Sequence, residues 1–81
     1  MSLEDIAKDV ARIATEVSGK DIPSYRDDLS VLGIDSLTML DLLAALEEHF
    51  GILLSENIIK EFRSVERISR IVRDSAVSGS R

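Results

Sequence analysis

Ser36 occupies the position in this 81-residue sequence that is best suited to chemistry. It lies within Gly33–Leu37, where the pattern of an apolar helix begins. The first turn of a helix has backbone N–H groups without partners and lies at the positive end of the helix dipole. A serine there is well placed to bear a phosphate or phosphodiester group, because those N–H groups stabilise negative charge. The alternative is a serine that only caps the helix, which is a common role for serine at a helix start.

No other residue supplies the partner that an enzymatic serine nucleophile requires. A serine hydrolase needs a base within about 3 Å of the serine hydroxyl. The only histidine, His49, lies 13 residues further along the same predicted helix, which corresponds to about 20 Å. We therefore interpret His49 as a solvated residue at the end of that helix. The sequence also has no glycine-rich phosphate loop, and it does not predict an enzyme.

The composition limits the remaining classes of function. The chain has no cysteine and one histidine, so neither a disulfide nor a metal site is expected. The net charge of −5 disfavours binding to nucleic acid or to an anionic membrane, because both need clustered Lys and Arg. No apolar run approaches the roughly 20 residues of a membrane span, and no signal peptide is evident. We expect a monomeric protein of the cytoplasm.

Charge is unevenly distributed along the chain. Seven acids and no Lys or Arg fall between Asp27 and Glu56, whereas six bases and three acids fall between Lys60 and Arg81. The pattern indicates either two solvated helix faces of opposite sign or an acidic surface that partners recognise.

Four helical segments are expected to position Ser36. Apolar spacings predict helices over residues 3–18, 36–50, 56–61 and 65–75. Their expected capping residues are Ser2, Asp35, Ser55 and Ser64. Residues 20–35 show no helical period, and we expect Leu29, Leu32 and Ile34 to pin this loop to the core. The predicted fold is an all-α four-helix bundle with a short third helix. Its domain spans residues 1–76, and residues 77–81 form a disordered tail.

The predicted helix over residues 36–50 has two contrasting faces. At about 100° per residue, its core face comprises Met39, Leu42, Leu43, Leu46 and Phe50. Leu37 lies opposite that face and Leu40 lies at its border. The outward residues are Asp41, Ala44, Glu47 and Glu48. Exposed leucines ringed by acids indicate a partner-binding face, although single exposed leucines are also common in purely structural helices.

The residues around Ser36 closely resemble the phosphopantetheine attachment signature of acyl carrier proteins. The core of that signature is leucine-glycine, one residue, then aspartate-serine-leucine, and Leu32–Leu37 matches it. The stretch Leu42–Gly51, the helix order, the long first loop and the short third helix also match, so the resemblance covers about residues 3–74. It implies that a phosphopantetheinyl transferase moves 4′-phosphopantetheine from coenzyme A onto the Ser36 hydroxyl. The absence of cysteine agrees with this, because the prosthetic arm would supply the thiol for thioesters.

The resemblance also implies two sets of functional residues. Acyl-transferring, condensing or modifying enzymes with basic docking patches are expected to recognise Asp35, Leu37, Leu40, Asp41, Ala44, Glu47, Glu48 and Glu56. An apolar interior that can shelter an acyl chain is expected at Leu46, Leu54, Ile59, Phe62 and Ile68. The implied function is to carry acyl intermediates and to present them to such enzymes.

The chain departs from the fatty-acid type of acyl carrier protein in its second half. The third helix of that type is usually strongly acidic, whereas Glu56–Phe62 is less charged and more apolar, and Arg63–Arg73 carries four arginines. These departures favour a specialised carrier in fatty-acid, polyketide or a related biosynthesis. A peptidyl or aminoacyl carrier protein, which would keep the fold and the serine, stays open as an alternative. So does an unmodified helical adaptor. The sequence does not identify the acyl cargo.

Overall fold

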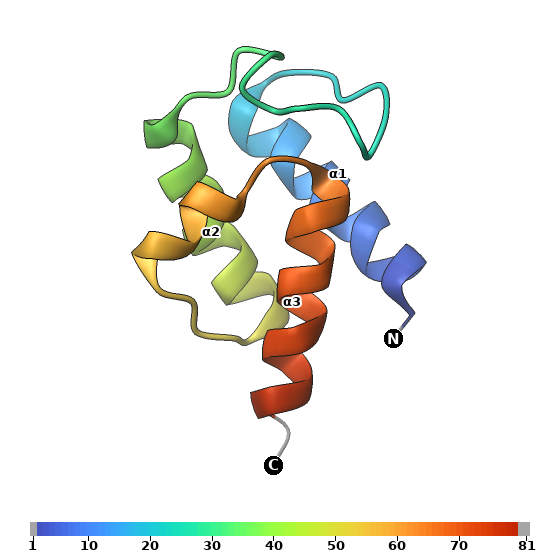
Figure 1. Cartoon of the computed structure of the whole chain (residues 1–81), viewed down its shortest axis with the longest axis vertical. Coiled ribbons are helices and arrows are strands. Elements are labelled where there is room, and N and C mark those ends of the chain that lie inside the picture. The colour runs from blue at the N-terminus through green and yellow to red at the C-terminus, as the bar shows by residue number, and fades with distance from the viewer. Residues whose placement is uncertain (1, 80–81) are drawn as a thin grey trace.

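The computed structural model describes residues 2–79, except for the side chains of residues 77–79. Its helices are α1 (Leu3–Ser18), α2 (Ser36–Phe50), the 3-10 helix η1 (Glu56–Glu61) and α3 (Val65–Gly79). No strand occurs among these residues. The structure confirms the predicted all-α bundle with a short third helix and a long loop between the first two helices (Figure 1).

The helix starts follow from local capping. Each predicted capping residue accepts a hydrogen bond from a backbone amide of the following turn; the four are Ser2, Asp35, Ser55 and Ser64. These bonds satisfy backbone donors that have no partner within the helix. α1 and α2 both end where a glycine adopts a left-handed conformation, at Gly19 and Gly51. The sequence therefore determined the bounds of α1, α2 and η1 through short-range chemistry.

α3 is longer than the sequence predicted. The expected end was near Ser75, with residues 77–81 in a disordered tail, whereas the helix continues to Gly79. No proline interrupts this segment, and Ala76 is a strong helix former, so nothing stops the helix before the glycine. Residues 80 and 81, the remainder of the predicted tail, lie outside the described residues.

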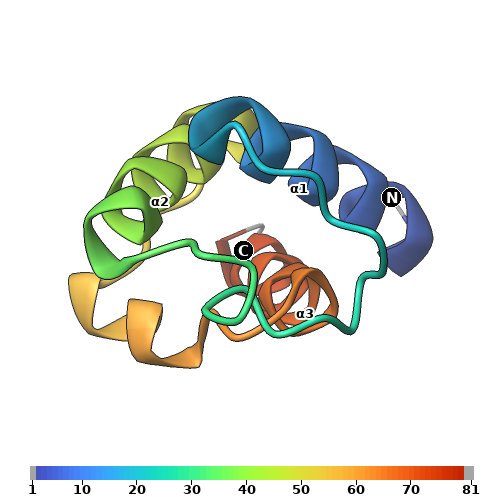
Figure 2. The ribbon, with the colours of Figure 1, turned by 90° about the horizontal axis from the view of Figure 1, so that it is seen from above.

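An aliphatic core lies between the three α-helices. α1, α2 and α3 pack around it, and η1 packs against α2 (Figure 2). Its largest fully buried apolar side chains are Val10, Leu29, Leu42, Leu46, Val65, Ile68 and Val72. The predicted core face of α2 is confirmed by burial of Met39, Leu42, Leu43 and Leu46, whereas Phe50 at the helix end is half-buried. Within the described residues, no helix combines the length and the apolar character needed to cross a membrane.

The loop between α1 and α2 crosses one end of the bundle (Figures 1 and 2). Its predicted anchors are buried or half-buried against the core: Leu29, Leu32 and Ile34. The Leu29 amide donates a hydrogen bond to the Arg63 carbonyl at 2.8 Å, and the Glu66 amide donates one to the Tyr25 carbonyl at 2.9 Å. The loop is thus tied to the start of α3, and it delivers residues 35 and 36 to a defined place at the end of the bundle.

Candidate functional site

A tight turn just before α2 sets the position of Ser36. Gly33 has a φ of 89°, a backbone conformation that side-chain-bearing residues rarely adopt. A Cβ at this position would lie 3.5 Å from the Lys20 ammonium nitrogen, which is an ordinary contact. Conformational freedom, more than space, therefore requires glycine here. Ile34, directly after the turn, is buried in the core, whereas Ser36 two residues later lies on the surface.

Asp35, and not Ser36, caps α2. A carboxylate oxygen of Asp35 accepts a hydrogen bond from the Thr38 amide at 2.9 Å. This bond lowers the pKa of Asp35 below its ordinary value, and a hydrogen bond with the Thr38 side chain lowers it further. Because the cap is already supplied, the interpretation of Ser36 as a simple capping serine loses its basis.

Ser36 is the first residue of α2, and its side chain is exposed. Among the described residues, its hydroxyl takes part in no hydrogen bond, and the amides of Ser36 and Leu37 have no acceptor. These amides point along the start of the helix, where its dipole is positive. The site can therefore accept negative charge attached to the Ser36 oxygen.

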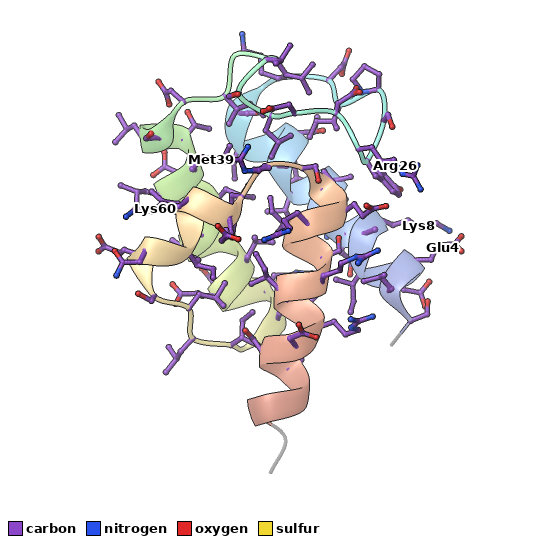
Figure 3. All side chains as sticks on the ribbon, viewed as in Figure 1. Glu4, Lys8, Arg26, Met39 and Lys60 are labelled. Atoms are coloured by element: carbon purple, nitrogen blue, oxygen red, sulfur yellow. The ribbon has the colours of Figure 1, made fainter. Side chains whose placement is uncertain are left out.

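Two open hollows flank Ser36. They share the residues Ser36, Met39, Ile59 and Lys60. The larger, of about 410 Å³, lies between α2 and η1 and is completed by Leu40, Glu56 and Asn57. The smaller, of about 270 Å³, extends toward the α1–α2 loop and also includes Asp28, Asp35 and Arg63. Met39 and Lys60, which come from the two facing elements, are labelled in Figure 3. An exposed hydroxyl therefore lies between two grooves with apolar floors and charged rims.

Four predicted partner-binding residues gather around Ser36. Asp35 precedes it directly, and Leu40 and Glu56 border the larger hollow. Leu37 follows Ser36 and is 71% exposed, as the helical wheel predicted. These residues could be contacted together by a protein that approaches the Ser36 hydroxyl.

The other predicted partner-binding residues lie further along α2. Asp41 and Ala44 are exposed. Glu48 is exposed as well, but it borders a separate hollow between α2 and α1 together with Arg12 and His49. Leu37, Asp41, Ala44 and Glu48 follow one another at spacings of four, three and four residues, so they share one exposed face of α2, and Glu48 at its far end lies next to α1.

Glu47 has a structural contact that the sequence did not predict. It is half-buried, and its carboxylate accepts a hydrogen bond from the Leu54 amide at 2.8 Å. The side chain thus turns toward the segment that links α2 to η1. A wheel drawn on α2 alone cannot place this contact, because it depends on the path of the chain after Gly51.

The predicted acyl-chain residues divide into a pair that borders the hollows at Ser36 and a group that lies further inside. Ile59 and Phe62 border hollows that Ser36 shares. Leu46 and Ile68 have no exposed surface, and Leu54 is half-buried against the core. An apolar chain that starts at Ser36 would therefore meet Ile59 and Phe62 before it could reach Leu46 or Ile68.

Sequence reasoning did not assign a site role to Lys60, Arg63 or Asp28, which border the hollows at Ser36. The sequence analysis named Lys60 only as the first base of the basic segment that runs to Arg81. Its nearness to Ser36 arises because η1 runs back along α2 toward the start of that helix (Figure 1). The unusual base in that short helix was the one available signal.

His49 lies at the opposite end of α2 from Ser36. It is exposed, and its Nε2 lies 3.3 Å from a carboxylate oxygen of Asp9 on α1. It therefore links two helices and gives Ser36 no base. In the part of the chain that the structure describes, no group of three or more His, Asp or Glu residues is arranged to hold a metal ion.

Comparison with known proteins places this site in a family context. Residues 3–72 match the family described as phosphopantetheine attachment site. The acyl carrier protein of Acidothermus cellulolyticus is 32% identical over an alignment of 84 positions that covers 96% of each chain. The crystal structure of an acyl carrier protein from Thermotoga maritima superposes with a TM-score of 0.80 at 25% identity, over 96% of this chain and 94% of the other. A chain in the structure of the ishigamide ketosynthase/chain length factor gives a TM-score of 0.73 at 27% identity, over 86% and 92%.

Proposed function

The chain belongs to the acyl carrier protein family, and we propose that Ser36 carries the 4′-phosphopantetheine group of that family. The observation that carries this assignment is the state of the Ser36 side chain. It is exposed at the first residue of α2, and Asp35 supplies the cap that the serine would otherwise provide. The unpartnered amides of the first turn suit the negative charge of a phosphodiester. The residues present therefore fit the group.

Attachment requires one substitution at phosphorus. The Ser36 oxygen forms a new bond to the phosphorus that bears pantetheine in coenzyme A. The bond from that phosphorus to the diphosphate bridging oxygen breaks, adenosine 3′,5′-bisphosphate leaves, and the hydroxyl proton passes to a base. No histidine or other base contacts Ser36 among the described residues, so this proposal assigns that base to a phosphopantetheinyl transferase.

The prosthetic group supplies a thiol, on which acyl groups are carried as thioesters. The chain contains no cysteine of its own. Its residues supply the attachment oxygen, the surface that partners recognise and the grooves beside the oxygen. The protein therefore acts as a carrier for biosynthetic enzymes.

The proposed partner-recognition surface comprises Asp35, Leu37, Leu40, Asp41, Ala44, Glu48 and Glu56. Glu47 also belongs to it, although its carboxylate binds the Leu54 amide as well. Exposure of Leu37 beside the acids supports it, because a small apolar contact can follow an electrostatic encounter. Partners that fit this surface present Lys or Arg around the entrance of their active sites.

An acyl chain would first contact Ile59 and Phe62, since both border hollows at Ser36. Entry to Leu46, Leu54 and Ile68 would require α2 and η1 to separate. η1 contributes no fully buried residue, and elements with few buried contacts open most easily. We therefore also propose that the acyl chain can enter this interior.

A condensing enzyme is the class of partner that we favour. The likeness to a chain in the ishigamide ketosynthase/chain length factor structure supports it. Lys60 and Arg63 also give the surroundings of Ser36 a basic character, in contrast to the strongly acidic third helix of the fatty-acid type. These features favour a specialised pathway, polyketide or related, over general fatty-acid synthesis. We also propose that the protein is a monomer and that it resides in the cytoplasm.

The direct experiment is to incubate the protein with coenzyme A, Mg²⁺ and a broad-range phosphopantetheinyl transferase, and to measure its intact mass. The wild-type chain should gain one phosphopantetheine, and Ser36→Ala should gain none. Ser30→Ala is the matched control, because Ser30 borders the smaller hollow with Ser36 and should leave modification intact. An unmodified wild-type chain would contradict the proposal.

A further inference from the structure

Two basic side chains lie beside Ser36, from η1 and from the link that follows it. Lys60 borders both hollows that include Ser36, and Arg63 borders the smaller one. Both side chains are exposed. Lys60 extends from η1 where that helix runs along α2 (Figure 3). A group attached to the Ser36 oxygen would therefore have two cations within its surroundings.

Neither cation is already neutralised by an ion pair. Within the described residues, no carboxylate oxygen lies within 4.0 Å of the charged nitrogens of Lys60 or Arg63. The neighbouring Arg67, by contrast, pairs with Glu61. Lys60 and Arg63 are thus free to interact with a further anion.

Three carboxylates border the same hollows, and among the described residues none of them forms an ion pair with Lys60 or Arg63. Asp35 accepts the Thr38 amide. Asp28 accepts the amide and the hydroxyl of Ser30 at 2.9 Å and 2.7 Å. Glu56 borders the larger hollow with Lys60, four residues away along the chain, without forming an ion pair. The two aspartates keep their negative charge, because their hydrogen bonds come from neutral groups, and the hydrogen bonds from Ser30 together with the charge of Arg63 lower the pKa of Asp28. Since neither cation is held in an ion pair among the described residues, both can still contact a further anion at Ser36.

We propose, on the basis of attachment at Ser36, that Lys60 and Arg63 bind the phosphodiester that joins the prosthetic arm to the Ser36 oxygen. Ammonium and guanidinium groups both form charge-assisted hydrogen bonds to phosphate oxygens. The free amides of Ser36 and Leu37 add donors on the α2 side. The phosphodiester is then held between α2 and η1, which favours the larger hollow as the start of the path of the arm.

The physical signature of this interaction is a dependence on salt. The two cations are exposed, so each contact with the phosphodiester is weak and easily screened. The Debye length falls from about 10 Å at 0.1 M salt to about 3 Å at 1 M. Stabilisation of the protein by the attached group should therefore be present at low salt and largely lost at high salt.

The test compares apo and holo forms of three proteins: wild type, the double variant Lys60→Gln/Arg63→Gln, and the control Arg70→Gln. Arg70 is an exposed base on α3 that borders neither hollow at Ser36. Intact mass first establishes modification at Ser36. If wild type is not modified, attachment at Ser36 fails and the phosphodiester site fails with it. With modification established, the remaining measurements address Lys60 and Arg63 alone.

Two readouts then decide the inference. In wild type and Arg70→Gln, conversion to holo should shift the backbone and side-chain NMR signals of Lys60 and Arg63. At low salt, conversion from apo to holo should also raise the melting temperature of these two proteins by about 4 °C more than it raises that of the double variant. The same holo-minus-apo difference in all three proteins would overturn the inference. So would a double variant that only slows the transferase, because the cations would then serve an acidic surface of the partner.

Discussion

The Glu47 carboxylate accepts a hydrogen bond from the Leu54 amide at 2.8 Å, which ties α2 to the segment that leads into η1. The carbonyl of the same residue accepts hydrogen bonds from the amides of Gly51 and Ile52. Glu47 therefore fixes the path of residues 51–55, and with it the position of η1 beside Ser36. A residue expected on the partner surface turns out to support the geometry of the site.

Replacing Glu47 by alanine should loosen this link. Loss of one charge-assisted, half-buried hydrogen bond should lower the free energy of unfolding by about 1 kcal/mol. The Leu54 amide should also exchange with solvent faster, as hydrogen exchange monitored by NMR can show. Glu48→Ala, which removes an exposed acid next along the helix, should do neither. Equal effects of the two variants would contradict the structural role of Glu47.

The contrast between Glu47 and the helix caps shows what the sequence could predict. The caps at Ser2, Asp35 and Ser55 act on amides two or three residues away, so residue type and spacing were sufficient. The burial of Leu46 followed from helical periodicity in the same way. The contact of Glu47 with Leu54 spans seven residues and a change of chain direction.

The position of Lys60 beside Ser36 was out of reach for a related reason. The two residues belong to different elements, and their nearness depends on how the linker at residues 51–55 folds and on where η1 packs. A helical wheel describes one helix and carries no information on a neighbouring element. Ser36 itself was identified from the sequence because its motif, its cap and its helix are contiguous in the chain.

Acid should destabilise the protein partly through Asp35. The hydrogen bond from the Thr38 amide lowers the pKa of Asp35 below its ordinary value of 3.8. Its contribution to stability is therefore complete above the unfolded-state pKa and is lost as the pH falls through the folded-state pKa. The hydroxyl of Ser30 lowers the pKa of Asp28 in the same direction, so both carboxylates act in one window.

Asp35→Asn isolates this contribution, because asparagine keeps a capping oxygen but does not titrate. Thermal melts between about pH 5 and pH 2 should show a smaller loss of melting temperature for Asp35→Asn than for wild type. An identical acid-induced loss in the two proteins would show that the Asp35 cap is not coupled to folding.

Replacing two leucines of α2 by alanine should affect different properties, stability for Leu46 and partner docking for Leu37. Leu46 has no exposed surface, so Leu46→Ala should cost about 2–5 kcal/mol of unfolding free energy. Leu37 is 71% exposed, so Leu37→Ala should change stability by less than about 0.5 kcal/mol. It should instead reduce productive docking of the transferase, measured as a lower rate of holo formation. A loss of stability without a loss of rate for Leu37→Ala would remove it from the partner surface.

The acids of α2 should steer the transferase toward Ser36. Asp41→Lys/Glu48→Lys should lower the association rate while leaving the fold intact, since both side chains are exposed and Glu47 is left in place. The rate for wild type should fall with added salt, because the Debye length shortens from about 10 Å at 0.1 M to about 3 Å at 1 M. Stopped-flow or surface-based kinetics would measure both effects.

The control for this experiment is reversal of exposed bases on α3, Arg70→Glu/Arg73→Glu, which changes the charge by the same size on another helix. This variant should alter association much less. A rate that is flat with salt, or an α3 variant as slow as the α2 variant, would show that the recognition surface lies elsewhere.

Site-specific mass spectrometry of the protein after treatment with coenzyme A and a transferase tests the central claim most directly. The account predicts one phosphopantetheine per chain, located by fragmentation on Ser36. It also predicts none on Ser36→Ala, and full modification of Ser30→Ala. Ser36→Ala should retain the circular dichroism and melting behaviour of a folded helical protein, because Asp35 still caps α2. Modification of Ser36→Ala, or a wild-type chain that stays unmodified while a known carrier protein is fully converted beside it, would contradict the account.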